Sequence, residues 1–281
     1  MSWSTNLAAP DPAGFVENLR PALIEAARTA RRLEGVAPNE PKHGEASAEK
    51  RALTKADLAT QEILLAALMV HHPGVQLAAE EQTPGVERFP AQSEDVVVID
   101  PIDGTLHSYL EAKGPYAIMV GLVHRGEYRA GLVALPREGL FFDAAAGGGA
   151  WRTRVEGVPR PATPGAGAGQ ILVAHGTPPE VVQALEEEDL SVRHGCGGAV
   201  SVAPLIPGIR AGLRWVPSAD GISVRGRVGA LIAREASAVV AEASGRDFPR
   251  DMDTPAHSLL VTRSQEDREI LSRAMARAGI L

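Results

Sequence analysis

The segment that most constrains this chain is residues 96–105, which read Val-Val-Val-Ile-Asp-Pro-Ile-Asp-Gly-Thr. An apolar strand over 96–99 runs directly into a turn that carries Asp100, Asp103 and Thr105. Carboxylates are the hard oxygen ligands that Mg²⁺ or Ca²⁺ requires, and two of them on one tight turn can share cations. The pattern therefore predicts a buried strand ending in a cation-binding turn, although Asp-Pro and Asp-Gly steps also occur in ordinary turns.

Two further residues set the backbone of this turn. Pro101 fixes one backbone angle and has no N–H to donate. Gly104 allows the left-handed geometry that brings both aspartate side chains to one side.

Composition narrows the class of protein. A chain of 281 residues with 44% hydrophobic and 22% charged residues can bury a sizeable core, as one large domain or two lobes. No window approaches the roughly 18 consecutive apolar residues of a membrane helix, and the start lacks a secretory pattern, so we expect a cytoplasmic protein. Cys196 is the only cysteine, which excludes an internal disulfide and a thiolate metal cluster. The net charge of −7 argues against nucleic acid and favours small-molecule partners.

The predicted elements divide into two sets. In the first, apolar spacing predicts helices over about 13–34 and from Thr54 to near Pro73, and strands at 75–79, 96–99, 116–124, 129–135, 140–144 and 149–153. The later strands are separated by short turns, so we expect them to be antiparallel.

Residues 156–169 are rich in Pro and Gly and are typical of a seam. Beyond the seam the pattern alternates: strands at 170–174, 190–193, 238–242 and 258–262, and helices at 179–187, 198–206, 225–236 and 264–278. We therefore expect an N-terminal α+β lobe over 1–155 and a C-terminal α/β lobe over 156–281, together forming one unit.

Acidic side chains lie at the ends of three predicted elements. Asp57 follows a helix start, Glu80-Glu81 follows a strand, and Asp100 and Asp103 follow the next strand. Each has an ordinary structural explanation by itself, as a first-turn helix residue or a solvated charge pair. Together they suggest a ligand site, because the ends of neighbouring strands are where ligands are usually held.

In this order the sequence resembles the inositol monophosphatase family, whose pattern is a Thr-x-x-Asp helix, a Glu-Glu pair, Asp-Pro-Ile-Asp-Gly-Thr and a later Trp-Asp-x-Ala-Ala-Gly helix. The first three blocks are present at Thr54–Asp57, Glu80-Glu81 and Asp100–Thr105, and the likeness extends over roughly residues 45 to 262. The resemblance implies a mixed α/β fold, layered as an αβαβα sandwich, a Mg²⁺-dependent phosphatase activity and a homodimer.

The resemblance also implies roles for individual residues. Four would hold Mg²⁺: Glu80, Asp100, the carbonyl of Ile102, and Asp103. Thr105, with Asp57 behind it, would position the water that attacks phosphorus, and Glu80 joins these two as a catalytic residue. The residue types suit this chemistry, since metal ions generate hydroxide and neutralise the transferring phosphate oxygens.

The fourth block departs from the family. Alignment of the following helix places Val224-Arg225 where Trp-Asp is expected, so an arginine replaces a metal-binding carboxylate. Arg225 could substitute electrostatically for the second metal by binding phosphate oxygens. Asp220 could instead move in as a replacement ligand, or hydrolysis could be lost or weakened. A solvated arginine without a role is a fourth explanation.

The substrate side is predicted from a glycine-rich segment, His194-Gly195-Cys196-Gly197-Gly198-Ala199, which stands where relatives contact a sugar. Backbone N–H groups at such a helix start can receive hydroxyl or phosphate oxygens, although glycine-rich loops are often only loops. The expected substrate-binding residues are Gly104, Thr105, Gly195, Cys196, Gly197 and Arg225. We expect Cys196 to be a packed residue rather than a nucleophile. His107 could face the pocket, and His175 and His194 could contact a substrate or be exposed.

These observations favour Mg²⁺-dependent hydrolysis of a small phosphorylated metabolite: a sugar, inositol or nucleoside phosphate. One alternative is a catalytically weakened relative that binds a phosphorylated ligand or a protein. Another is a phosphatase of bisphosphate nucleotides or of fructose bisphosphate.

Overall fold

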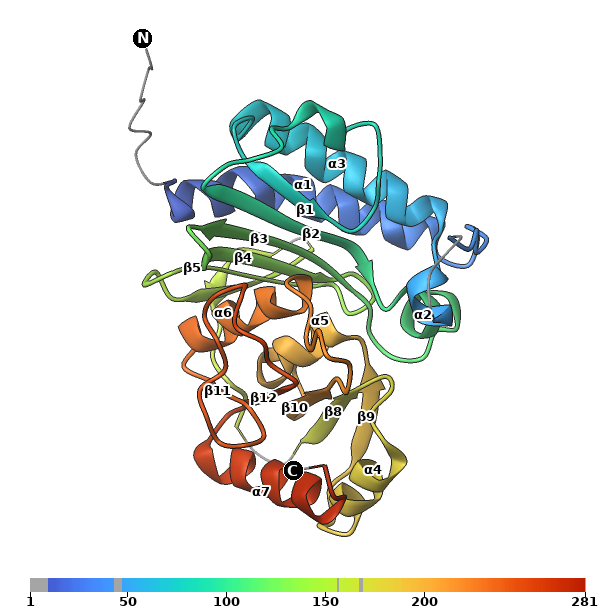
Figure 1. The fold of residues 1–281 in the computed structure, drawn as a ribbon, viewed down its shortest axis with the longest axis vertical. Coiled ribbons are helices and arrows are strands. Elements are labelled where there is room, and N and C mark those ends of the chain that lie inside the picture. Colours follow the sequence, from blue (N-terminus) through green and yellow to red (C-terminus); the bar gives the residue numbers. More distant parts are fainter. Residues whose placement is uncertain (1–9, 43–46, 156, 167–168, 281) are drawn as a thin grey trace.

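The computed structural model describes residues 10–42, 47–155, 157–166 and 169–280. Helices and sheets alternate in five layers (Figure 1). Helices α1 (Pro12–Leu33) and α3 (Lys55–His71) cover one face of the first sheet, and α5 (Gly197–Ser201) and α6 (Val228–Glu235) lie between the two sheets. Helices α4 (Pro179–Glu186) and α7 (Gln265–Arg277) cover the outer face of the second sheet. The predicted αβαβα sandwich is confirmed.

The first sheet contains seven strands in chain order. Strands β1 and β2 are parallel, and every later pair is antiparallel, as the short turns predict. The strands are β1 (Gln76–Ala79), β2 (Asp95–Asp103), β3 (Ala117–His124), β4 (Glu127–Leu135), β5 (Leu140–Ala145), β6 (Ala150–Arg154) and β7 (Arg160–Pro161). Short helical segments over Ala48–Arg51 (α2), Val86–Arg88 and Thr105–Leu110 complete this half.

The second sheet has five strands in the order β11-β12-β10-β8-β9. They are β8 (Gln170–Ala174), β9 (Val192–Gly195), β10 (Ile209–Trp215), β11 (Val239–Ala241) and β12 (Ser258–Thr262). The division of the chain into lobes at 155/156 stays a prediction.

The central strand of the second sheet, β10, is absent from the sequence prediction. Gly212 weakens the strand pattern there, yet the fold needs it: a Cβ at this position would lie 2.3 Å from the carbonyl oxygen of Val200 in α5. The helix predicted over 198–206 is also shorter than expected. It is α5 followed by a 3₁₀ turn at Ala203–Leu205, which contains Pro204.

The first core lies between α1, α3 and the first sheet. Helix α1 begins at Asp11, whose side chain accepts a hydrogen bond from the Ala13 N–H, and it buries Phe15, Leu19 and Leu23 at helical spacing. This packing fixes the sheet on which the acidic turn is carried. No helix within the described ranges is both long and apolar enough to cross a membrane.

Candidate active site

The Asp-Pro-Ile-Asp-Gly-Thr turn forms the end of β2. The pairing of β2 with β3 shifts register between Asp100 and Asp103, which places both carboxylates at the same edge. Gly104 follows with φ of 85°, and a Cβ there would lie 2.6 Å from the Cβ of Cys196. Only glycine combines this left-handed backbone with so close an approach to the start of α5.

A cavity of about 450 Å³ opens at this turn. Its walls come from the end of β2, the start of α5, the end of β10 and the loop before α6. A cavity of this size suits a small metabolite. It is lined by most of the residues that the sequence singles out: Glu80, Asp100, Ile102, Asp103, Gly104, Thr105, Cys196, Gly197 and Arg225.

Asp57 lies behind Thr105, outside the cavity wall. Its side chain accepts hydrogen bonds from the N–H and the hydroxyl of Thr54, at 2.8 and 2.7 Å, and so closes a capping box at the start of α3. The Thr105 hydroxyl lies 3.1 Å from Oδ1 of Asp57 and 2.7 Å from the carbonyl oxygen of Ile102. Because this hydroxyl has one proton, it donates to only one of the two acceptors at a time.

Burial raises the pKa of Asp57 to about 6, against the opposing effect of its hydrogen bonds from Thr54 and Thr105. The side chain is 1% exposed. A carboxylate with a pKa near neutrality, linked through a hydroxyl to the cavity, is suited to accept a proton there.

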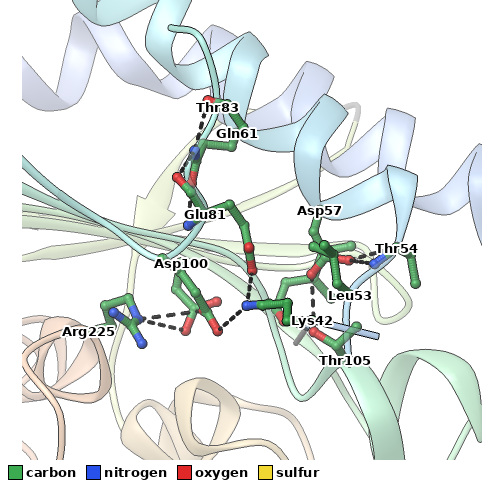
Figure 2. Close-up of polar contacts among 12 residues, drawn as sticks. Lys42, Leu53, Thr54, Asp57, Gln61, Glu81, Thr83, Asp100, Thr105 and Arg225 are labelled. Carbon is green, nitrogen blue, oxygen red and sulfur yellow. Dashed lines mark hydrogen bonds and ion pairs between the residues drawn. The ribbon is translucent and has the colours of Figure 1, made fainter. Parts of the chain in front are cut away.

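The carboxylates meet two cations of the chain itself (Figure 2). Nε of Arg225 lies 3.5 Å from Oε2 of Glu80 and 3.8 Å from Oδ2 of Asp100. Nζ of Lys42 lies 2.6 Å from Oε1 of Glu81 and 3.9 Å from Oε1 of Glu80. Arg225 therefore faces the acidic cluster, and its side chain, 30% exposed, does not extend freely into solvent.

Asp100 is a carboxylate buried beside other carboxylates. Burial raises its pKa well above the ordinary value, and the charges of Glu80 and Asp103 raise it further, while Arg225 opposes them. Its Oδ1 atom is buried and accepts no hydrogen bond from the described residues. An ionised carboxylate in this position needs an additional positive partner.

Hydrogen bonds to its backbone groups hold the neighbouring Glu80-Glu81 pair in place. The Glu80 N–H donates to the carbonyl of Ile99 at 3.1 Å, which continues the β1–β2 pairing and sets Glu80 beside Asp100. Gln61 on α3 accepts from the Glu81 N–H and donates to its carbonyl. Burial raises the pKa of Glu81, and its bond with Lys42 opposes this.

The structure separates some predicted substrate residues from the others. Gly195 lies at the end of β9 and does not line the cavity, because Pro115 and Leu172 pack against it. Cys196 is buried, which raises the pKa of its thiol and supports a packing role. Gly198 donates its N–H to Oδ2 of Asp103, so the start of α5 is tied to the acidic turn.

The remaining candidates also have definite places. His107 and His175 line the cavity, with ring centroids 5.0 Å apart, and His194 stacks on His175 outside it. Asp220 lines the cavity rim as an exposed residue.

Sequence reasoning missed Lys42, Gln61 and Arg214. Lys42 follows a proline in a loop with no periodic pattern, so no spacing links it to Glu81. Gln61 looks like any polar residue on a helix. Arg214, which lines the cavity, stands on the strand that was not predicted.

The donor set can be compared with what a metal ion requires. Glu80, Asp100 and Asp103 offer hard oxygens, as Mg²⁺ prefers, and Oδ1 of Asp100 has no other partner among the described residues. Glu80, Glu81 and Asp100 pair with the two cations Lys42 and Arg225, whereas Asp103 accepts the Gly198 N–H. When all four carboxylates are ionised, they carry two charges more than these cations, which one divalent ion would offset. The described residues hold no cluster of three or more His, Cys, Asp or Glu side chains already arranged around a metal position. The residues thus fit one cation better than two.

Comparison with known proteins finds similar sequences and similar structures. Residues 16–195 match the inositol monophosphatase family, a range that includes the first three motif blocks and ends before Val224-Arg225. A probable inositol 1-monophosphatase, ImpA, of Mycobacterium tuberculosis is 37% identical over 125 residues, which are 44% of this chain and 43% of that protein. The 3'(2'),5'-bisphosphate nucleotidase CysQ of Escherichia coli is 27% identical over 146 residues, 52% of this chain and 54% of the relative. The matches span about half of these relatives' length.

Solved structures share the whole fold at low identity. An inositol monophosphatase of Thermotoga maritima superposes with a TM-score of 0.73 at 18% identity, covering 95% of this chain and all of the other. Mycobacterium tuberculosis SuhB gives a TM-score of 0.67 at 21% identity, covering 97% of this chain and 100% of that one. An IMPase/NADP phosphatase solved with NADP and Ca²⁺ gives 0.69 at 18% identity, covering 94% and 96%.

Proposed function

Because this chain belongs to the inositol monophosphatase family, whose members are phosphatases, we propose that it hydrolyses a small phosphorylated metabolite with one bound Mg²⁺. The observation that carries this proposal is the buried Asp100 carboxylate, which lacks a hydrogen-bond partner for Oδ1 among the described residues and lies beside Glu80 and Asp103 at the cavity. A cytoplasmic location and a homodimer stay predictions.

In this proposal Glu80, Asp100, Asp103 and the carbonyl of Ile102 would hold the metal. The bound ion would lower the pKa of a water molecule and neutralise phosphate charge. When the Thr105 hydroxyl donates to Asp57, the Ile102 carbonyl oxygen is released as a ligand. The Thr105 oxygen would then be able to accept a hydrogen bond from the attacking water and so orient it.

Arg225 binds the phosphate group in place of a second metal. Its planar guanidinium can contact two phosphate oxygens at once, and it stands beside Glu80 and Asp100 at the cavity wall. Of the explanations that the sequence left open for Arg225, this one uses both its charge and its position. Asp220 is exposed at the rim, which makes replacement ligation the weaker explanation.

The second candidate is a phosphate-binding relative without turnover. It is favoured by Lys42 and Arg225, which already partly neutralise the carboxylates that a metal would use.

The test measures phosphate release from a panel of sugar, inositol and nucleotide phosphates, with Mg²⁺ and with EDTA, beside an Asp100→Asn variant. Turnover that needs Mg²⁺ and disappears in the variant supports the phosphatase. Phosphate-ester binding without turnover on any substrate supports the binding protein.

A further inference from the structure

A second cavity, of about 290 Å³, lies between the start of β4, helix α6 and the loop that joins β11 to β12. None of its lining residues also lines the cavity at the acidic turn. Within the described chain, its charged lining residues are four arginines and two glutamates: Arg129, Arg227, Arg234, Arg250, Glu127 and Glu235. The wall therefore has an excess of two positive charges, and the proposed hydrolysis uses none of these side chains.

The fold accounts for one of these arginines, Arg227, which is 4% exposed. Its guanidinium donates hydrogen bonds to the carbonyl oxygens of Ile222, Asp251 and Thr254. These bonds tie the loop before α6 to the loop between β11 and β12. Carbonyl dipoles stabilise the charge of Arg227 but do not cancel it, and no described carboxylate forms an ion pair with it.

Arg234 and Arg250 bring two further positive charges to the same cavity. Among the described residues, the Arg234 guanidinium donates only to the carbonyl oxygen of Phe248. Burial, together with the charge of Arg250, lowers the pKa of Arg234 to about 10, and the exposed Asp247 opposes this. The Arg250 guanidinium makes no hydrogen bond or ion pair with any described residue. Both charges would gain from an anion bound in the cavity.

The two glutamates of the wall do not supply that anion. Glu235 accepts hydrogen bonds from the N–H groups of Gly147 and Gly149, at 2.9 and 3.0 Å. Glu127 lies 3.8 Å from Arg129, and both side chains are largely exposed, so this ion pair is weak. Arg129 therefore keeps hydrogen-bond donors available for a ligand.

We propose that this second cavity is a binding site, separate from the active site, for a doubly charged phosphate group, either free phosphate or that of a small phosphorylated metabolite. The planar forks of Arg234 and Arg250 suit phosphate oxygens, and a dianion offsets the two excess charges of the wall. A neutral ligand would leave these guanidiniums without an anion, and a cation would be repelled. The volume is near the lower end for small-molecule sites.

The experiment is a calorimetric titration with inorganic phosphate in EDTA at pH 8, where phosphate carries close to two negative charges. The background variant is Arg225→Met, which removes the arginine proposed to bind phosphate in the active site. We expect this protein to bind phosphate, and the added substitution Arg250→Met to weaken binding by about 10- to 100-fold, the range for hydrogen bonds to a charged group. Arg129→Met is a second variant and should weaken it by a smaller factor. Because Arg250 makes no hydrogen bond, its replacement should not lower the unfolding temperature measured without phosphate.

The control is Arg246→Met on the same background. Arg246 lies in the turn after β11, its side chain is 75% exposed, and it does not line the cavity. Its loss removes the same charge from the same loop and should leave the phosphate affinity unchanged. Equal weakening by Arg246→Met and Arg250→Met would overturn the proposal, since only the net charge would then matter. Phosphate binding that Arg250→Met does not weaken, or no binding at all, would overturn it as well.

Two other probes, a three-carbon phosphomonoester and malonate, identify the source of the anion. Tighter binding of the phosphomonoester than of inorganic phosphate, weakened by Arg250→Met, supports a metabolite site, and the reverse order supports a site for free phosphate. Tighter binding of malonate than of either phosphate would overturn the assignment to phosphate. The titration contains no Mg²⁺ and measures no turnover, so its result is independent of whether the chain is a phosphatase.

Discussion

Nε of Arg225 lies 3.8 Å from Oδ2 of Asp100, so a cation of the chain contacts the buried carboxylate at the centre of the acidic turn. At this separation, opposite charges near a protein surface attract by several kcal/mol before solvation is counted. The same guanidinium would repel a metal ion held by that carboxylate. Under the proposed function Arg225 therefore has opposite effects on metal affinity and on phosphate binding, and the two can be measured separately.

Arg225→Met should bind Mg²⁺ more tightly and turn over more slowly. Removal of the positive charge lowers the repulsion on the ion, whereas loss of the charged hydrogen bonds to phosphate should reduce kcat/KM by about 10- to 100-fold. Calorimetric Mg²⁺ titration and phosphate release measure the two effects. Arg225→Lys, which keeps the charge without the planar fork, should be intermediate. Gain of turnover in Arg225→Asp would identify a weakened two-metal site instead.

Asp100→Asn should raise stability while it removes activity. The substitution relieves repulsion between Asp100 and its acidic neighbours and leaves a neutral buried group, so in EDTA we expect a gain of about 0.5–2 kcal/mol in the free energy of unfolding. Addition of Mg²⁺ should stabilise the wild type but not the variant. Urea unfolding with and without Mg²⁺ checks both statements.

The matched control for that experiment is Asp143→Asn. Asp143 is also buried, but it is paired with Arg20 at 2.9 Å, so its neutralisation leaves a partly buried arginine without its partner. This variant should lose about 3 kcal/mol or more. A loss of stability in both variants would contradict the account of Asp100 as a carboxylate destabilised by its acidic neighbours.

Asp57 should give the enzyme an acidic limb in its pH profile. Its pKa of about 6 means that the proton acceptor behind Thr105 is lost as pH falls through 6. Turnover should fall correspondingly, and Asp57→Asn should lack this limb and be nearly inactive. A wild-type profile that is flat between pH 5 and 7 would contradict the assignment.

The same carboxyl should also affect stability, in the opposite direction. Because its pKa in the folded protein lies above the ordinary 3.8, the folded state holds the proton more tightly than the unfolded chain. The contribution of Asp57 to the free energy of unfolding should therefore fall by up to about 3 kcal/mol as pH rises from about 4 to above 6. Comparison of wild type with Asp57→Asn at pH 4, 5, 6 and 7 isolates this dependence.

Lys42→Met should destabilise the protein near neutral pH. The Glu81 side chain is 5% exposed and would keep its charge without the ammonium group that lies 2.6 Å away. We expect a loss of about 1–3 kcal/mol that shrinks at acidic pH, where Glu81 becomes protonated. The control, Lys55→Met, removes an exposed pair with Glu40 at 3.6 Å and should change stability by less than about 0.5 kcal/mol.

Local patterns in the sequence predicted most of the framework. Helix α3 begins one residue after the predicted cap at Thr54, and strands β8 and β12 have the predicted bounds, because caps and short apolar runs are encoded locally. Strand β10 was missed because Gly212 is required by the contact with α5, a tertiary constraint that one sequence does not reveal.

The site was predictable to a similar extent. Asp100, Asp103 and Thr105 share one turn, so their neighbourhood follows from the chain. Arg225 was identified as a candidate only by alignment with a family. Its side chain points towards the carboxylates because of how the loop before α6 packs. Lys42 and Arg214 lie on segments without any sequence signal for their positions, and only folding brings Lys42 to Glu81 and Arg214 to the cavity.

The two cations that contact the acidic cluster lie far apart in the sequence: Lys42 precedes the first sheet, and Arg225 follows β10 and precedes β11 and β12. A ribosome releases the carboxylates of Glu80, Asp100 and Asp103 long before it releases Arg225. During that interval Lys42 is the one member of this pair of cations that has been synthesised. A first half made in this order carries one positive charge fewer at its acidic cluster than the finished protein does.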